Sequence, residues 1–302
     1  MASLKEVKDR IDSVKSTKKI TSAMKMIATA KLRKSQQAIN SFLPYSTKLN
    51  EILTNLLASD SSIDSVYAQE REIRKIAIVA FSSNSSLCGG FNANVVKEFS
   101  SVASQCAKIV GKENIIVYPF GKKIADFARK SNFAIESNST FQQITDRPAF
   151  PPILQISKEL VDKFLSKEID QIILVYTHFK SMGVQQIKSN VYLPFDLKGA
   201  IEKANLDSGA SNINQTTDYI LEPEKGELLS HLIPKVLASN LFAALLDSNA
   251  SENAARSLAM QIATDNAEEL VGDLTIEYNK NRQAAITNQL LDIIGGASAL
   301  SK

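Results

Sequence analysis

The sequence has no tryptophan, only two cysteines, and no long apolar run. Cys88 and Cys106 are too few for a disulfide framework and lack zinc-site or CxxC spacing, so they are typical of packed thiols in a reducing compartment. No stretch approaches the ~20 apolar residues of a membrane-spanning helix, and the first residues lack the apolar segment of a signal peptide. These absences predict a soluble chain that could reach a membrane only through a partner.

Glycine and proline, which interrupt helices, are concentrated in the middle of the chain. Residues 1–88 contain no glycine and only Pro44, while residues 227–294 contain only Gly272 and Pro234. The two ends therefore predict long helices, the first of them bent or divided at Pro44. At ~1.5 Å per residue they would span roughly 75 and 100 Å. That length favours an exposed antiparallel shaft over a helical bundle core.

Apolar residues spaced three and four apart predict the seam along which the two helices pair. In the first helix Lys18 interrupts the apolar pattern, and from there we expect the seam to continue along a neighbouring stripe of the helix surface. The expected seam positions are Leu4, Val7, Ile11, Val14, Ile20, Met24 and Ile27 in the first helix, and Leu229, Ile233, Leu237, Leu241, Leu245, Met260, Ala263, Ala267, Leu270 and Leu274 in the last.

The middle of the chain alternates buried-strand and amphipathic-helix patterns. This series predicts an α/β fold, a doubly wound Rossmann-like domain with helices on both faces of its sheet, joined to a long antiparallel coiled coil of the N- and C-terminal helices. The expected strands are 76–81, 114–120, a strand near 133–137, 171–179 and 186–195; the expected helices between them are 92–108, 122–131 and 153–168.

The same patterns predict three domains. An N-terminal shaft helix covers residues 1–57, an α/β domain covers 74–222, and a C-terminal shaft helix covers 227–297 and pairs with the first. The polar loop at 203–217 carries no motif to which we assign a role.

The loop SSNSSLCGGFN follows the first predicted strand, where doubly wound folds bind phosphate. It contains neither GxGxxG nor GK[ST], so we interpret it as a tight turn or a protein contact. His178 and His231 lack the HExxH and GxSxG contexts of catalytic sites. Carboxylates occur singly, and no acid/base pair stands out. The sequence predicts no catalytic site, metal or cofactor.

Residues 16–36 hold six lysines and arginines and no acid, although the net charge is only +3. Nucleic-acid binding favours aromatic or arginine-rich surfaces, yet residues 1–37 contain no aromatic and only Arg10 and Arg33 as arginines. A membrane-surface helix needs bulky anchors, and the isoleucines and methionines here are assigned to the seam. We therefore expect the basic helix either to dock on an acidic protein or to be solvated.

Three stretches of the sequence resemble the gamma subunits of F-type ATP synthases: KDRIDSVKSTKKITSAMKMIATAKLRKSQ, SSLCGGFNANV, and SENAARSLAMQIATDNAEELVGDLTIEYNKNRQAAITNQLLDIIGGASAL. The resemblance implies a rotor shaft whose helices enter a hexamer of alpha and beta subunits. The α/β domain would form the foot, beside the epsilon subunit and the membrane c-ring. The chain would transmit torque and couple ion flow to ATP synthesis or hydrolysis on the beta subunits, without being catalytic itself.

The resemblance also implies a place in the cell and roles for individual residues. The chain would be a peripheral protein held at a membrane by the complex. Because no targeting sequence precedes MASLKEV, we expect a bacterial protein on the cytoplasmic face of the inner membrane, with no nucleic-acid partner. The alternatives are a coiled-coil adaptor protein that binds an acidic partner and an α/β nucleotide enzyme with a helical appendage. Expected partner contacts are Met24, Lys25, Arg256, Arg282, Gln283 and Thr287; expected foot or subunit contacts are Arg33, Leu87, Gly89 and Gly90; the tail Ile286, Leu290, Leu291, Ile293 and Ile294 is expected to turn in a hydrophobic sleeve.

Overall fold

The computed structural model describes residues 4–58, 67, 71–136, 140–195 and 225–300. The predicted loop at 203–217 lies outside the described residues. Contacts divide the chain into two compact units, one formed by residues 1–29 with 256–302 and the other by residues 30–255. Helices α1 (Leu4–Ala58) and α7 (Lys225–Leu300) contribute residues to both.

The larger unit contains a five-stranded sheet with the order β3-β2-β1-β4-β5. Four strands are parallel, and β5 pairs antiparallel with β4. This order is that of a doubly wound sheet whose direction of winding reverses between β1 and β4, which confirms the predicted fold class. The strands are β1 (Ile76–Phe81), β2 (Ile115–Phe120), β3 (Ala134–Ile135), β4 (Gln171–Phe179) and β5 (Gln185–Leu193).

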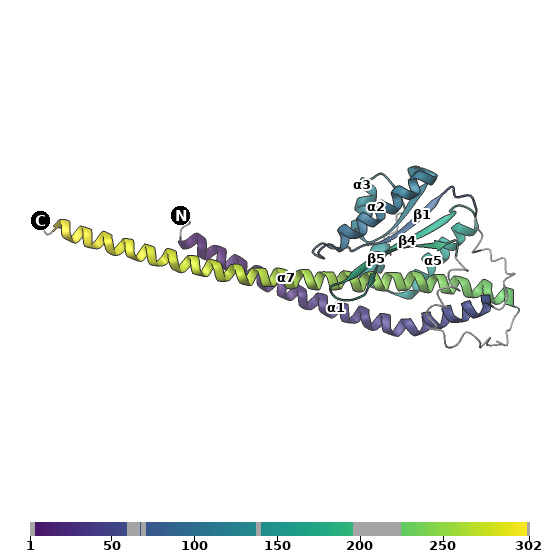
Figure 1. The fold of residues 1–302 in the computed structure, drawn as a ribbon, viewed down its shortest axis with the longest axis horizontal. Helices are drawn as coiled ribbons and strands as arrows, with labels where there is room; N and C mark the ends of the chain where they lie inside the picture. The colour runs from purple at the N-terminus through teal and green to yellow at the C-terminus, as the bar shows by residue number, and fades with distance from the viewer. Residues whose placement is uncertain (1–3, 59–66, 68–70, 137–139, 196–224, 301–302) are drawn as a thin grey trace. The chain divides into compact units, whose positions relative to one another are not determined.

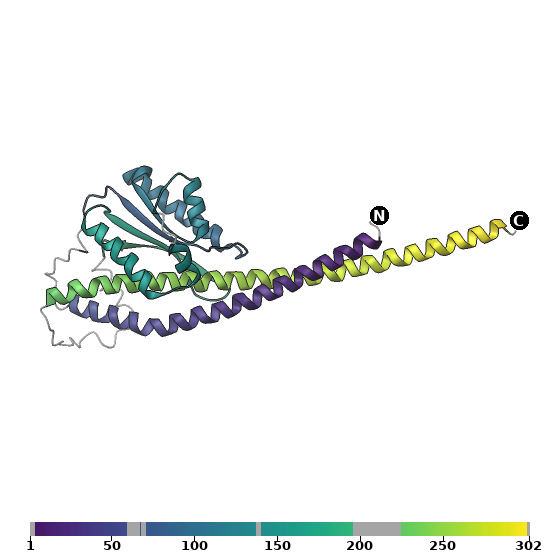
Figure 2. The same ribbon diagram turned by 180° about the vertical axis from the view of Figure 1, so that it is seen from behind.

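Helices cover both faces of this sheet (Figures 1 and 2). Every residue of β1 is buried, because alternate side chains enter cores on opposite faces. Ile78 packs with α2 and α3, whereas Val79 belongs to the core formed with α5 and with segments of α1 and α7. The connecting helices are α2 (Phe91–Val110), the short 3₁₀ helix η1 (Lys112–Asn114), α3 (Lys122–Lys130), α4 (Thr140–Asp146) and α5 (Phe150–Leu165).

The two terminal helices supply much of the second core. Leu53 and Leu56 of α1, with Ile233 and Leu237 of α7, are at most 2% exposed in the same cluster as Val79 of β1. Burial of one such side chain contributes about 1.5–3 kcal/mol. Parts of the predicted shaft helices are therefore structural elements of the α/β unit.

Helix α1 continues through Pro44 without division. Two residues before it, the Phe42 ring packs edge-on against Phe242 of α7 at a centroid distance of 4.9 Å, and it lies 6.0 Å from Phe150. Proline removes one helical hydrogen bond, and these aromatic contacts compensate for that loss.

Helix α7 is the one described helix that is long and apolar enough to cross a membrane, with a mean hydropathy of 1.4 in its most apolar window. The expectation that no segment reaches this length and hydropathy was therefore wrong. In that window 61% of the helix is buried inside the protein, which is typical of a core helix, so the property is weak evidence for a membrane span.

In the smaller unit α1 and α7 run antiparallel. Val7, Ile11 and Leu274 form a buried cluster. Further along, Lys18 pairs with Glu268, Thr21 with Thr264, and Thr29 with Ser257, so residue numbers rise along α1 as they fall along α7. The pairing predicted for the two helices is present here.

The apolar pattern had suggested that the seam drifts at Lys18, but in the structure it does not. Ile20 and Ile27 are 60% and 59% exposed, whereas Ala28 is 1% exposed. On α7, Leu270 is 38% exposed. The seam keeps strict three-four spacing because helix geometry fixes which positions face the partner, whatever residues occupy them. Its positions in this unit are Val7, Ile11, Val14, Lys18, Thr21, Lys25 and Ala28 on α1, and Ser257, Met260, Thr264, Ala267, Val271, Leu274 and Tyr278 on α7.

Candidate partner-binding surfaces

The SSLCGGFN loop is a closed turn held by its own side chains. Ser83 and Asn92 exchange hydrogen bonds of 2.8–3.1 Å, and the amide of Asn92 also donates to the sulfur of Cys88 at 3.0 Å. Cys88 packs in turn with Phe91, Val95 and Ala255 of α7. The side chains of Ser83, Asn92 and Cys88 are thus engaged with one another, which supports the interpretation of the loop as a structural turn.

The predicted foot residues lie on the surface of this unit. Leu87 has φ +67° and its side chain is 58% exposed at the tip of the turn. Gly89 adopts φ +56°, a conformation that glycine enters without steric cost, and Gly90 precedes the first residue of α2. Arg33 is exposed on α1. An exposed leucine on a rigid turn can contact a partner without rearrangement.

The predicted partner contacts occupy two places along the helices. Met24 and Lys25 of α1 and Arg256 of α7 are each half-buried. Arg282, Gln283 and Thr287 are exposed on α7, and 26 residues separate Arg256 from Arg282. At 1.5 Å per residue that separation is roughly 39 Å, so these residues form an elongated series and not one pocket.

The last described turns of α7 present apolar side chains to solvent. The exposed fractions lie between 48% and 68%. A soluble protein rarely exposes a contiguous apolar surface unless it meets a partner there. The residues are Ile286, Leu290, Leu291, Ile293 and Ile294.

His178 at the end of β4 contacts Asp247 of α7, with 2.7 Å between Nδ1 and Oδ2. Burial raises the pKa of Asp247, and the bond to His178 opposes that shift. Such a pair activates a nucleophile only when an aligned hydroxyl or thiol is free. The nearby hydroxyls of Ser248 and Ser251 instead bond the backbone of Thr177, so the cluster holds β4 against α7. His231 is exposed on α7.

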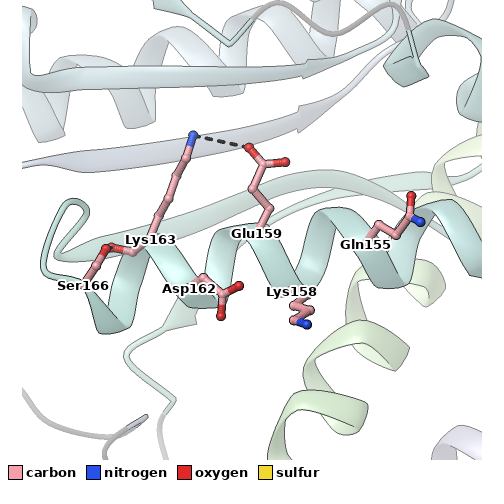
Figure 3. Close-up of a pocket in the computed structure, with 6 residues that line it drawn as sticks. All are labelled: Gln155, Lys158, Glu159, Asp162, Lys163 and Ser166. Carbon is pink, nitrogen blue, oxygen red and sulfur yellow. Dashed lines mark hydrogen bonds and ion pairs between the residues drawn. The ribbon is translucent and has the colours of Figure 1, made fainter.

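A groove of about 450 Å³ follows α5 (Figure 3). Lys163 points toward Glu159 at 3.3 Å and donates a 3.0 Å hydrogen bond to Tyr118. Burial opposes the charge of Lys163, but the bond to Tyr118 and the carboxylates of Glu136 and Glu159 outweigh it and raise the pKa of Lys163. A lysine held cationic cannot act as a nucleophile. The groove is lined by Gln155, Lys158, Glu159, Asp162, Lys163 and Ser166.

Within the part of the chain that the structure describes, no group of three His, Cys, Asp or Glu side chains could hold a metal ion. Separately, the surfaces above present exposed arginines and apolar side chains, which are residue types that protein–protein interfaces use.

Sequence reasoning missed a buried polar network between α1 and α7 in the larger unit. Ser35, Asn249, Asn253 and Thr145 are joined by hydrogen bonds of 2.7–3.1 Å. The signal was present as SNASEN, a run of small polar residues within an otherwise apolar helix.

Comparisons with known proteins agree with this geometry. A family model described as ATP synthase matches residues 3–300. The ATP synthase gamma chain of Bacteroides fragilis is 52% identical over 99% of this chain and 100% of its own length, and that of Flavobacterium psychrophilum is 44% identical over 99% of both. The chain belongs to this ATP synthase family, and these relatives are gamma chains.

Solved structures share the fold. A chain of the Euglena gracilis mitochondrial ATP synthase, in a structure of OSCP, F1 and the c-ring, has a TM-score of 0.62 and 18% identity, and covers 98% of this chain and 94% of its own. A chain of the Tetrahymena thermophila central stalk and c-ring has a TM-score of 0.55 and 22% identity, with 81% of this chain and 99% of its own covered.

Proposed function

We propose that this chain is the rotor shaft of an F-type ATP synthase, transmitting torque between a membrane c-ring and a catalytic hexamer of alpha and beta subunits. The observation that carries the proposal is α7, a single helix of 76 residues that pairs with α1 through a regular seam and then presents an exposed apolar end. A helix stabilised by a packed seam resists bending better than an isolated one.

The proposed working parts follow the predicted domains. Residues 1–57 and 227–297 form the shaft, and the unit built on residues 74–222 forms the foot that meets the epsilon subunit and the c-ring. Arg282, Gln283, Thr287 and the apolar tail contact the hexamer. Met24, Lys25 and Arg256 lie further along, facing the beta subunits, while Arg33, Leu87, Gly89 and Gly90 contact the foot partners.

We further propose that the chain is not itself catalytic and that it associates with the cytoplasmic face of a bacterial inner membrane only through the complex. The closed turn after β1 and the cationic state of Lys163 support the first statement. A coiled-coil adaptor remains the competing function, because exposed basic helices also suit an acidic partner.

Rotation tests the proposal directly. A probe attached at an exposed foot position of this chain is followed while alpha and beta subunits are immobilised and ATP is added. We expect rotation in one direction that stops when ATP is removed. A stationary probe with sustained ATP turnover would contradict the rotor function. Saturable ATP binding by the isolated chain at micromolar concentration would contradict its non-catalytic role.

A further inference from the structure

The last part of α7 continues past the start of α1 without a partner helix (Figures 1 and 2). The final apolar cluster of the pair is that of Val7, Ile11 and Leu274, with Tyr278 packed against it. From residue 279 to residue 297, which we call the end segment, no residue is buried. At 1.5 Å per residue the end segment is roughly 28 Å long.

The end segment has few of the features that stabilise a single helix. It forms no ion pair and no side-chain hydrogen bond with any residue that the structure describes. Gly295 and Gly296 each disfavour a helix relative to alanine, and β-branched residues, which lose rotamer freedom there, occupy four other positions. Most helical stability in proteins comes from packing of an apolar face, which the end segment lacks. The paired part of α7 supports it at one end only.

Apolar side chains nevertheless gather on one face of the end segment. At roughly 100° per residue, five of them fall within an arc of about 160°. The opposite arc carries Asn281, Asn288, Gln289 and Asp292. Such a pattern is typical of a helix that buries one face and leaves the other in water. The five residues, which we call the apolar stripe, are Ile286, Leu290, Leu291, Ile293 and Ile294.

The composition of the end segment indicates the chemistry of its partner. The apolar stripe contains no charge, so it fits an uncharged apolar wall. Helices that lie on membrane surfaces carry lysine and arginine along their polar face. Here the basic residues Lys280 and Arg282 precede the stripe, and the polar face beside it carries Asp292. The pattern therefore favours a groove in a protein over a lipid surface.

We propose that the end segment becomes a stable helix only when its apolar stripe docks on one apolar wall of a partner protein. The identity of that partner rests on the proposed rotor function, under which the wall belongs to the hexamer of alpha and beta subunits. The polar face stays solvated, so the end of α7 contacts one side of its cavity and is not enclosed on all sides. Because docking and helix formation are coupled, part of the free energy of binding is used to order the segment.

Hydrogen exchange tests both parts of the proposal on the full chain, alone and assembled with alpha and beta subunits. In the free chain, amides of the end segment should exchange at least tenfold faster than those of residues 257–278, which lie in the paired section. In the complex, exchange of the end segment should slow at least tenfold. Equal exchange of the two sections in the free chain, or no slowing in the complex, would overturn the proposal.

Two further outcomes separate this proposal from the rotor function. An assembled complex whose end segment still exchanges rapidly contradicts the docking alone, whereas a chain that does not assemble contradicts the rotor function and the partner together. Protection that rises with the concentration of the free chain would show that a second copy is the partner, and would overturn the docking on the hexamer.

Paired substitutions test the one-sided contact. Leu290→Gln removes an apolar side chain from the stripe with little change in helix propensity, and should reduce the protection gained in the complex at least fivefold. Asn288→Gln on the polar face is the matched control and should retain that protection. Asn288→Leu should behave like Asn288→Gln, because the added side chain stays in water. A fivefold gain for Asn288→Leu over Asn288→Gln would show that the cavity encloses the segment and would overturn the one-sided contact.

Discussion

The hydroxyl of Ser35 in α1 donates a 2.7 Å hydrogen bond to Oδ1 of Asn249 in α7. The amide nitrogen of Asn249 donates in turn to the carbonyl of Thr145 at 2.8 Å, and Asn253 donates to the same Oδ1 at 3.1 Å. One side chain thus joins both terminal helices to the end of α4 within the larger unit. A satisfied, partly buried amide of this kind fixes the arrangement of its neighbours.

Replacing this amide should destabilise the unit. Asn249→Ala leaves the Thr145 carbonyl without this donor, at a cost of about 1–3 kcal/mol for a buried group that stays unpaired, while the Ser35 hydroxyl keeps its 3.1 Å bond to the Lys31 carbonyl. Asn114 is the matched control, since its amide also donates to a backbone carbonyl but is exposed. Asn114→Ala should cost under about 1 kcal/mol. Denaturant unfolding measures the free energy of unfolding of both variants. Equal losses of stability would refute the stabilising role assigned to the Asn249 amide.

A charge on the seam should be far more damaging than one beside it. Ile11 is 8% exposed in the cluster with Val7 and Leu274, so Ile11→Asp buries an unpaired carboxylate at a cost of about 3–5 kcal/mol. Lys15→Asp, on the exposed face one turn away, should cost under about 1 kcal/mol. Thermal unfolding, monitored through the loss of helix content, distinguishes the two variants. Similar midpoints for the two variants would mean that this seam contributes nothing to stability.

Gly121, between β2 and α3, should not tolerate a side chain. Its φ is +110°, and an added Cβ would lie 2.1 Å from the carbonyl oxygen of Ser82. Gly111 has φ +78° with nothing within 4 Å of an added Cβ, so Gly111→Ala isolates the backbone strain, about 1–3 kcal/mol. Gly121→Ala should cost about 1–3 kcal/mol more because of the added clash. Equal losses of unfolding free energy in Gly111→Ala and Gly121→Ala would show that the backbone at Ser82 moves to accommodate the added Cβ.

Acid should weaken the larger unit through Asp170. Burial opposes the charge of Asp170, but the N–H groups of Arg74 and Lys75, at 2.9 and 3.0 Å, and the Arg71 guanidinium outweigh it and lower the pKa of Asp170 below its ordinary value of 3.8. A lowered pKa means that the charged carboxylate stabilises the fold above pH 3.8. This stabilisation is lost as the pH falls through the folded-state pKa.

Asp170→Asn should therefore lose stability at neutral pH and show a flatter dependence on pH between about 5 and 3. The exposed Asp126, which pairs with Arg129 at 3.4 Å, provides the control. Asp126→Asn should follow the parent curve. Melting temperatures across this range test the prediction, and parallel curves for Asp170→Asn and the parent would contradict it.

Most elements could be predicted from the sequence because their patterns are strong. The strand at 171–179 was located to the residue, and the scarcity of glycine and proline located both terminal helices. Helix α4 was not predicted, since its seven residues are too short to show a helical period.

The α1 seam beyond Val14 and the polar network at Asn249 were not predicted, for a common reason. Hydrophobicity ranks Ile20 and Ile27 above Thr21 and Ala28, yet the fixed angle between successive helical residues places Thr21 and Ala28 toward the partner helix. Likewise Asn249 is polar, and only the positions of Ser35 and Thr145 in space make its partial burial favourable.

The surface positions assigned to partners rest on the family resemblance. Arg282, Gln283 and Thr287 are exposed, and their roles as partner contacts are predictions.

Both ends of the chain cover one face of the sheet, and this arrangement constrains when the larger unit can fold during synthesis. The face of β1 that carries Ala77, Val79 and Phe81 is completed by α7, which is synthesised after the whole sheet. Until residues 225–255 emerge, that apolar face lacks a main part of its cover, and such intermediates are prone to aggregation. Contacts between residues so distant in sequence also form slowly. Completion of the unit therefore waits until this part of α7 has emerged, and the growing chain should depend on chaperones until then.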